Sequence, residues 1–127
     1  MTRDRISLGK EGEELACRHL ERLGYRILAR NYRGRRGEID IVAEERGTLV
    51  FVEVKSRSGP LFGHPLEAVT RRKQEQLGRV AQEYLAVTDA HRARPIRFDV
   101  VGVLMAPGLP PSLDLVRDAF ALGEEGR

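Results

Sequence analysis

The sequence has a single cysteine, no tryptophan and no long run of apolar residues. The lone Cys17 excludes an internal disulfide and a zinc site built from several cysteines. No apolar segment approaches the roughly 18 residues that a membrane span requires, and residues 1–5 lead into no apolar stretch typical of a signal peptide. These absences predict a protein without membrane segments that resides in the cytoplasm, a reducing compartment.

Size and composition predict one domain. A chain of 127 residues lies below the length at which chains usually divide, which excludes a second independent domain. Hydrophobic residues make up 41% and charged residues 32%, enough apolar material for one packed core. We therefore expect a single domain over residues 1–127, with an ordered core over about 8–117 and a frayed C-terminal tail.

Lysine is scarce, and the basic residues are unevenly distributed. Lys10, Lys55 and Lys73 are the only lysines among 22 basic residues. Residues 1–37 carry ten basic against five acidic side chains, and residues 71–97 carry seven against three. Two basic segments favour a polyanionic partner such as a nucleic acid, although scattered arginines also serve to keep a surface soluble.

Apolar periodicity predicts alternating helices and strands. Helical spacing of apolar residues predicts helices over residues 8–23, ended by Gly24, and from residue 66 to about 87. Residues 30–37 are expected to form a mobile loop and 44–47 a hairpin turn. The expected strands cover residues 25–29, 38–43, 48–55, 96–104 and 113–116. The order of helix, three strands, helix and one or two strands indicates an α/β fold.

The register of the central hairpin decides which side chains lie together. With Ala43 opposite Thr48, one face of the hairpin is apolar throughout. That face holds Ile39, Ile41, Ala43, Val50, Val52 and Val54. The opposite face then carries four charged side chains at the open end of the hairpin: Glu38, Asp40, Glu53 and Lys55.

This charged cluster is a candidate metal site. Three carboxylates beside one ammonium leave a charge imbalance that a divalent cation would correct. Asp40 and Glu53, with the main-chain carbonyl of Val54, would form the incomplete oxygen cage that Mg²⁺ accepts while it keeps several waters. A charged strand end in solvent is the alternative, and four charges at one end favour the metal.

Lys55 and two side chains from the predicted helices could contribute to this site. The compact ammonium of Lys55 fits beside a metal-bound water where a guanidinium would not. Lys73 follows the apolar stripe of the second helix, so it either extends into solvent or reaches the site. Glu13 borders the apolar face of the first helix and either points at the sheet or stays solvated.

Asp99 lies in a strand that is otherwise suited to burial. We expect it to pair with Arg97 or another arginine.

The motifs at residues 9–14, 37–40, 51–57 and 69–74 together resemble the YraN-type family of uncharacterised small bacterial proteins. That family resembles a branch of the PD-(D/E)xK nuclease superfamily and is similar in size and motif order to archaeal Holliday-junction resolvases. The resemblance implies a restriction-endonuclease-like three-layer core with a mixed sheet in helix-strand-strand-strand-helix-strand order. Glu38-Ile39 stands where the superfamily motif usually has proline before the aspartate.

The resemblance also implies roles for individual residues. Asp40 and Glu53 would bind Mg²⁺ or Mn²⁺, Lys55 would position or activate the attacking water, and Glu13 would complete the site. The implied function is that of an endodeoxyribonuclease acting on branched or irregular DNA.

Basic side chains would hold the DNA backbone with little readout of sequence. The candidates are Arg30, Arg33, Arg35, Arg36, Arg57, Arg71, Arg72 and Lys73. Two alternatives stay open: a non-catalytic nucleic-acid-binding module of a repair or uptake system, and a protein-interaction domain with structural carboxylates. A homodimer is expected only by analogy with four-way-junction enzymes.

Overall fold

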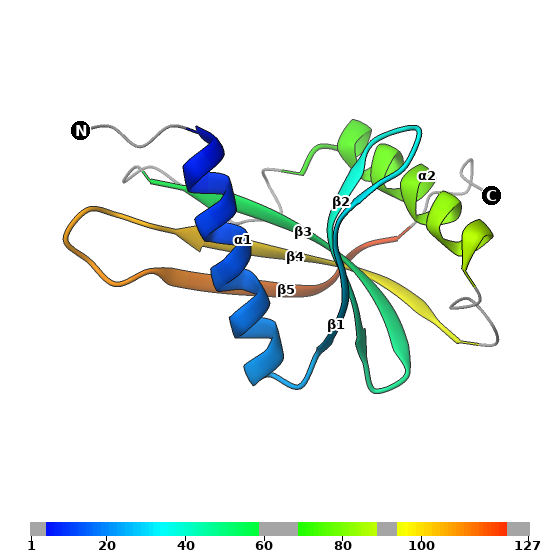
Figure 1. Cartoon of the computed structure of the whole chain (residues 1–127), viewed down its shortest axis with the longest axis horizontal. Coiled ribbons are helices and arrows are strands. Elements are labelled where there is room, and N and C mark those ends of the chain that lie inside the picture. The colour runs from blue at the N-terminus through cyan, green and yellow to red at the C-terminus, as the bar shows by residue number, and fades with distance from the viewer. Residues whose placement is uncertain (1–4, 59–68, 89–93, 122–127) are drawn as a thin grey trace.

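A computed structural model describes residues 5–58, 69–88 and 94–121 of the chain (Figure 1). The elements are α1 (Arg5–Arg22), β1 (Arg26–Arg33), β2 (Glu38–Glu45), β3 (Thr48–Arg57), α2 (Arg71–Val87), β4 (Ile96–Leu104) and β5 (Ser112–Phe120). The predicted order is confirmed, with two strands after α2. Neither described helix is long and apolar enough to cross a membrane.

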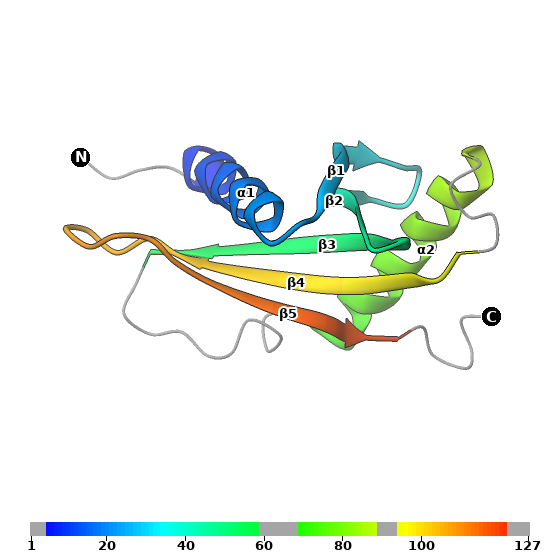
Figure 2. The same ribbon diagram turned by 90° about the horizontal axis from the view of Figure 1, so that it is seen from below.

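The strands form one mixed sheet in the order β1-β2-β3-β4-β5. Of the strand pairs in the described residues, only β3 and β4 run parallel, and α2 lies in the crossover that a parallel connection requires. Helix α1 packs on one face of the sheet and α2 on the other (Figure 2). The predicted α/β architecture of three layers is therefore confirmed.

Two apolar clusters hold the layers together. Ala16 and Leu20 of α1 pack on the face that includes Ile41 and Val52. On the opposite face, α2 packs against a cluster that includes Phe51. Because alternate residues of β3 face opposite ways, each strand contributes to both clusters, as the alternating pattern predicts.

The end of α1 is set by a glycine. Gly24 has a φ of +99°, its N–H donates to the Glu21 carbonyl, and the Tyr25 N–H donates to the Leu20 carbonyl at 3.0 Å. These two bonds form a Schellman motif, which suits glycine because the position needs a left-handed backbone. The predicted helix stop at Gly24 is confirmed.

The β2–β3 hairpin has a tighter turn than predicted. Arg46 and Gly47, with φ values of +51° and +84°, form a two-residue turn of the I′ kind between Glu45 and Thr48. Ala43 consequently lies opposite Val50 rather than Thr48. The register prediction was wrong by two residues, and because a shift of two keeps the alternation, Ile41, Ala43, Val50 and Val52 still lie together as predicted.

Strand β2 parts from β3 before its first residues. The β2–β3 ladder begins at the pair Ile41–Val52, whereas β2 pairs with β1 as far as Glu38. Ile39 therefore packs with Val42 in the cluster beneath α2, not with Ile41 as predicted. The bend of β2 away from β3 causes this difference and shapes the site described below.

The segment predicted as a mobile loop is ordered. Residues 30–33 continue β1, because Tyr32 and Arg33 pair with Ile39 and Glu38. The main-chain N–H groups of Arg35 and Arg36 donate to the two carboxylate oxygens of Glu83 on α2, at 2.6 and 3.1 Å. Contacts with distant parts of the chain thus override the loop-like composition.

Other element boundaries also differ from prediction. Helix α2 begins at Arg71, not at residue 66, because Thr70 caps it and accepts a hydrogen bond from the Lys73 N–H at 3.2 Å. Helix α1 begins at Arg5, three residues before the predicted start. Strand β5 extends to Phe120 along β4, beyond the predicted short strand 113–116. The tail over 122–127, predicted to fray, lies outside the described residues.

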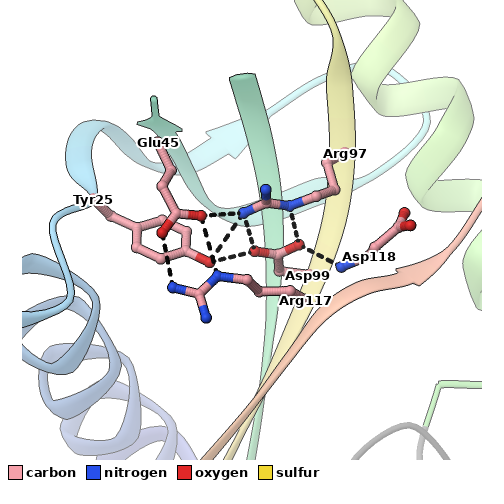
Figure 3. Close-up of polar contacts among 6 residues, drawn as sticks. All are labelled: Tyr25, Glu45, Arg97, Asp99, Arg117 and Asp118. Carbon is pink, nitrogen blue, oxygen red and sulfur yellow. Dashed lines mark hydrogen bonds and ion pairs between the residues drawn. The ribbon is translucent and has the colours of Figure 1, made fainter. Parts of the chain in front are cut away.

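A polar network joins Tyr25, the residue before β1, to strands β2, β4 and β5 (Figure 3). Asp99, fully buried, accepts hydrogen bonds from the Tyr25 hydroxyl at 2.7 Å and from Arg97 Nε at 2.8 Å, so the predicted Asp99–Arg97 pair is confirmed. Arg97 and Arg117 both donate to Glu45 at the end of β2. These bonds, that of Arg117 first, lower the pKa of Glu45 to about 2.

Candidate metal centre and basic pocket

Asp40 lies where β2 leaves β3. Its Oδ2 accepts a hydrogen bond from the main-chain N–H of Val54 at 2.8 Å. The regular ladder begins one residue later, at Ile41–Val52, so the Asp40 side chain bridges the two strands where main-chain pairing has stopped. The bend in β2 thus brings a carboxylate to the edge of β3.

The carboxylates of Asp40 and Glu53 interact in a partly buried site. Glu53 is only 5% exposed. Burial, followed by repulsion from Glu53 and hydrogen bonding to it, raises the pKa of Asp40 to about 8 against the opposing effect of the Val54 N–H. At neutral pH the pair therefore favours a shared proton or a nearby cation.

Two lysines from different elements reach Glu53. Lys55 Nζ lies 3.4 Å and Lys73 Nζ 3.8 Å from Glu53 Oε2. Lys55 comes from the same strand as Glu53, two residues on, while Lys73 comes from the first turn of α2. Of the two alternatives for Lys73, the contact supports the one in which its side chain reaches this site.

Glu13 approaches the site from α1. At Gly12 the helix lies so close to β3 that a Cβ would stand 1.8 Å from Ser56 Oγ. Glu13 is already hydrogen-bonded, to Asn31 Nδ2 at 2.8 Å and to Arg30 at 3.3 Å. Its negative charge still adds to the rise in the pKa of Asp40, so it borders the carboxylate pair.

The predicted cluster is smaller than expected because Glu38 lies elsewhere. Glu38 pairs with β1, where its carboxylate is 3.4 Å from the Arg33 guanidinium. Among the residues that the structure describes, no three His, Cys, Asp or Glu side chains are grouped to hold a metal ion. The donor set is therefore Asp40 and Glu53, two hard oxygen ligands whose mutual repulsion suits a divalent cation that keeps several waters.

A pocket of about 390 Å³ lies along α2 and is called the basic pocket below. It is lined by Arg36, Thr70, Arg72, Lys73, Gln76 and Arg79. Lys73 belongs both to this lining and to the surroundings of Glu53, so the pocket and the carboxylates share one side chain.

The predicted DNA-binding side chains divide into three groups. Arg36, Arg72 and Lys73 meet in the basic pocket. Three others are paired with carboxylates: Arg30 with Glu13 and Glu14, Arg33 with Glu38, and Arg71 with Glu75. Arg35 and Arg57 are exposed. Their contacts with DNA stay a prediction, as do the catalytic and metal roles of Asp40, Glu53, Lys55 and Glu13.

Sequence reasoning missed three lining residues, Thr70, Gln76 and Arg79. Gln76 and Arg79 follow Arg72 at helical spacing, four and seven residues on, so these two share one face of α2 with Arg72. That spacing was a usable signal, whereas the contact of this face with Arg36 depends on tertiary structure.

Comparison with known proteins gives one consistent result. A family model described as "Uncharacterised protein family UPF0102" matches residues 12–103. A UPF0102 protein of Clavibacter michiganensis subsp. michiganensis is 50% identical over 119 residues, covering 94% of this chain and 99% of the relative. One from Rhodococcus opacus is 46% identical over 115 residues (91% and 97% covered). One from Chlorobaculum tepidum is 45% identical over 124 residues (94% and 95%). The resemblance to the YraN-type family is confirmed at this level.

Proposed function

This chain belongs to the uncharacterised protein family UPF0102, and on that premise we propose that it is a metal-dependent endonuclease of the PD-(D/E)xK type. The proposed substrate is DNA, with a preference for branched or irregular structures. The observation that carries the proposal is the interacting pair Asp40 and Glu53, with the Lys55 ammonium 3.4 Å from Glu53.

The two carboxylates are suited to hold Mg²⁺ or Mn²⁺. Asp40 and Glu53 supply hard oxygen donors from adjacent strands, and the main-chain carbonyl of Val54 is the third candidate. A bound divalent ion would supply neutralisation of the negative charge that develops at phosphorus during hydrolysis. The raised pKa of Asp40 supports this assignment, because burial first and the neighbouring Glu53 carboxylate second disfavour the charged form of Asp40, which a bound cation would stabilise.

Lysine side chains supply the remaining chemistry. Lys55 is partly exposed, with 32% of its side chain accessible, so its ammonium can donate to a water or a phosphate oxygen while it stays near Glu53. Lys73 approaches the same carboxylate from α2 and is equally accessible to a phosphate. In this proposal Lys55 orients the attacking water and Lys73 neutralises substrate charge.

A binding module without cleavage is the second candidate. The basic pocket favours it, since four cationic side chains would attract a phosphate whether or not hydrolysis follows. The two candidates differ in whether the carboxylates act on the bound strand.

Cleavage assays with matched variants separate these functions. We expect the wild-type protein and the exposed control Asp114→Asn to cut a four-way junction in Mn²⁺ faster than a linear duplex. Asp40→Asn should bind the junction but not cut it. Cleavage that persists in Asp40→Asn would come from another enzyme, and binding without cleavage in every protein would favour the binding module.

A further inference from the structure

The first turn of α2 carries an arrangement that is unfavourable for the helix itself. It contains Arg71, Arg72 and Lys73 and no acidic residue. The helix dipole is positive at this end, so acidic side chains stabilise a first turn and basic ones destabilise it. Arg72 and Lys73 of this turn line the basic pocket, where Arg36 and Arg79 add two more cations. A bound anion would offset this concentration of like charge.

A loop from the other side of the pocket is anchored to α2. The Gly34 N–H donates to the Gly37 carbonyl at 2.8 Å, which closes the turn between β1 and β2. Glu83 accepts the main-chain N–H groups of Arg35 and Arg36, and Gln76 Nε2 donates to the Arg36 carbonyl at 2.8 Å. Three hydrogen bonds therefore hold the backbone of the loop on the helix.

Glycines allow this close contact. A Cβ at Gly37, whose φ is +151°, would stand 2.6 Å from Gln76 Nε2, and one at Gly34 would stand 3.0 Å from Glu83 Oε1. A larger side chain at either position would displace the Gln76 or Glu83 side chain from its hydrogen bond to the loop. The fixed backbone places Arg36 beside Arg72 without the loop-ordering cost that a flexible loop would add on binding.

We infer that the basic pocket is a preformed phosphate-binding site for one phosphate group of the nucleic-acid strand, separate from the phosphate that is cleaved. The inference rests on the proposed function and names the part of the substrate that this pocket holds. Among the residues that the structure describes, the pocket is lined by three arginines and one lysine and by no carboxylate, a donor set suited to phosphate oxygens.

This phosphate-binding site also determines which phosphodiester bond of the bound strand is cut. Lys73 lines the pocket, and its Nζ lies 3.8 Å from Glu53 Oε2, so the phosphate bound in the pocket is held near the carboxylate pair. A strand anchored there places a neighbouring phosphodiester over Asp40 and Glu53. Glu83 and Gln76 act as positioning residues, because they fix Arg36 through its backbone.

The test measures binding without metal, so that it does not depend on cleavage. Affinity for a fluorescent oligonucleotide duplex is measured in EDTA over a salt series. Arg72→Gln and Arg79→Gln should each weaken binding about tenfold and lower the slope of log affinity against log salt by about one. Arg22→Gln, an exposed arginine at the far end of α1, is the matched control and should change affinity less than twofold.

A variant of Glu83 tests the positioning role. Glu83→Ala removes a negative charge, which by itself should strengthen binding to a polyanion. We expect weaker binding and a smaller salt slope instead, because Arg36 is released, with partial rescue by Glu83→Gln. Stronger binding by Glu83→Ala would overturn the positioning role.

Duplexes with and without a 5′-phosphate distinguish an internal phosphodiester from a terminal phosphate. Equal affinity for the two duplexes indicates that an internal phosphate occupies the phosphate-binding site. Tighter binding of the 5′-phosphorylated duplex that Arg79→Gln abolishes indicates a terminal phosphate. If both Arg72→Gln and Arg79→Gln kept the wild-type affinity, salt slope and unfolding temperature, the proposed phosphate-binding site would be wrong. Loss of binding in these variants without cleavage by the wild type would refute the nuclease alone.

Discussion

Replacing Asp40 with asparagine should stabilise the protein at neutral pH. The asparagine carbonyl can still accept the hydrogen bond from the Val54 N–H, but the variant no longer holds a negative charge beside Glu53. In the wild type the pKa of Asp40 rises from 3.8 to about 8 on folding. At pH 7 the unfolded state is ionised and the folded state is not, which costs the wild type stability.

The size of the effect follows from that shift. From pH 3.8 to pH 7 is about three pH units at about 1.4 kcal/mol each, an upper limit of roughly 4 kcal/mol. We expect a gain of about 2–4 kcal/mol, because the site relaxes around the charge.

The sign of the pH dependence is fixed. Below pH 3.8 aspartic acid is protonated in both states, so the variant and the wild type should be about equally stable. The advantage of Asp40→Asn should grow as pH rises from 3.8 and level off near pH 8.

Urea unfolding in EDTA from pH 4 to pH 8 measures this difference. Asp114→Asn, an exposed position on β5, is the matched control and should show no such gain. Adding Mn²⁺ at a hundred times its dissociation constant should stabilise the wild type by about 2.7 kcal/mol and Asp40→Asn far less. A gain that is independent of pH, or an Asp40→Asn protein less stable than wild type at pH 7, would contradict the inferred strain between the two carboxylates.

Three other substitutions test separate contacts by urea unfolding. Gly12→Ala should destabilise by about 1–3 kcal/mol, since its Cβ would meet Ser56, whereas Gly9→Ala has open space and should not destabilise. Arg72→Glu should stabilise α2 by about 0.3–1 kcal/mol while weakening duplex binding in EDTA; lower stability would argue against the dipole effect. Glu45→Gln should destabilise above pH 4.5, and the difference should shrink as pH falls towards 2, because the folded-state pKa of Glu45 is about 2; a constant difference would contradict that shift.

The faces of the central strands could be predicted because alternation is a local property. Val52 and Phe51 lie in opposite clusters, as their positions in the sequence require. The register was wrong because Arg46 adopts a positive φ of +51°, which is uncommon for arginine and which the sequence pattern did not indicate. A four-residue turn was predicted where the chain makes a two-residue turn.

The candidate site was predictable in part for the same reason. Glu53 and Lys55 are two residues apart on one strand, so their proximity follows from strand geometry. The anchoring of the loop does not, because the bonds from Arg35 and Arg36 to Glu83 join residues 48 and 47 positions apart. Lys73 was ambiguous, since its place on the helix fits either outcome.

The polar network at Glu45 and the bend at Asp40 lie at opposite ends of β2. Arg97 and Arg117 secure Glu45, and the ladder with β3 runs from that end only as far as Ile41. Strand β2 is thus held by β1 to its first residue but by β3 only from Ile41 onward, so the bond from the Val54 N–H to Asp40 Oδ2 continues the link to β3 at this end. Because Oδ2 already joins the two strands, Oδ1 is the oxygen that a ligand could take up without separating them.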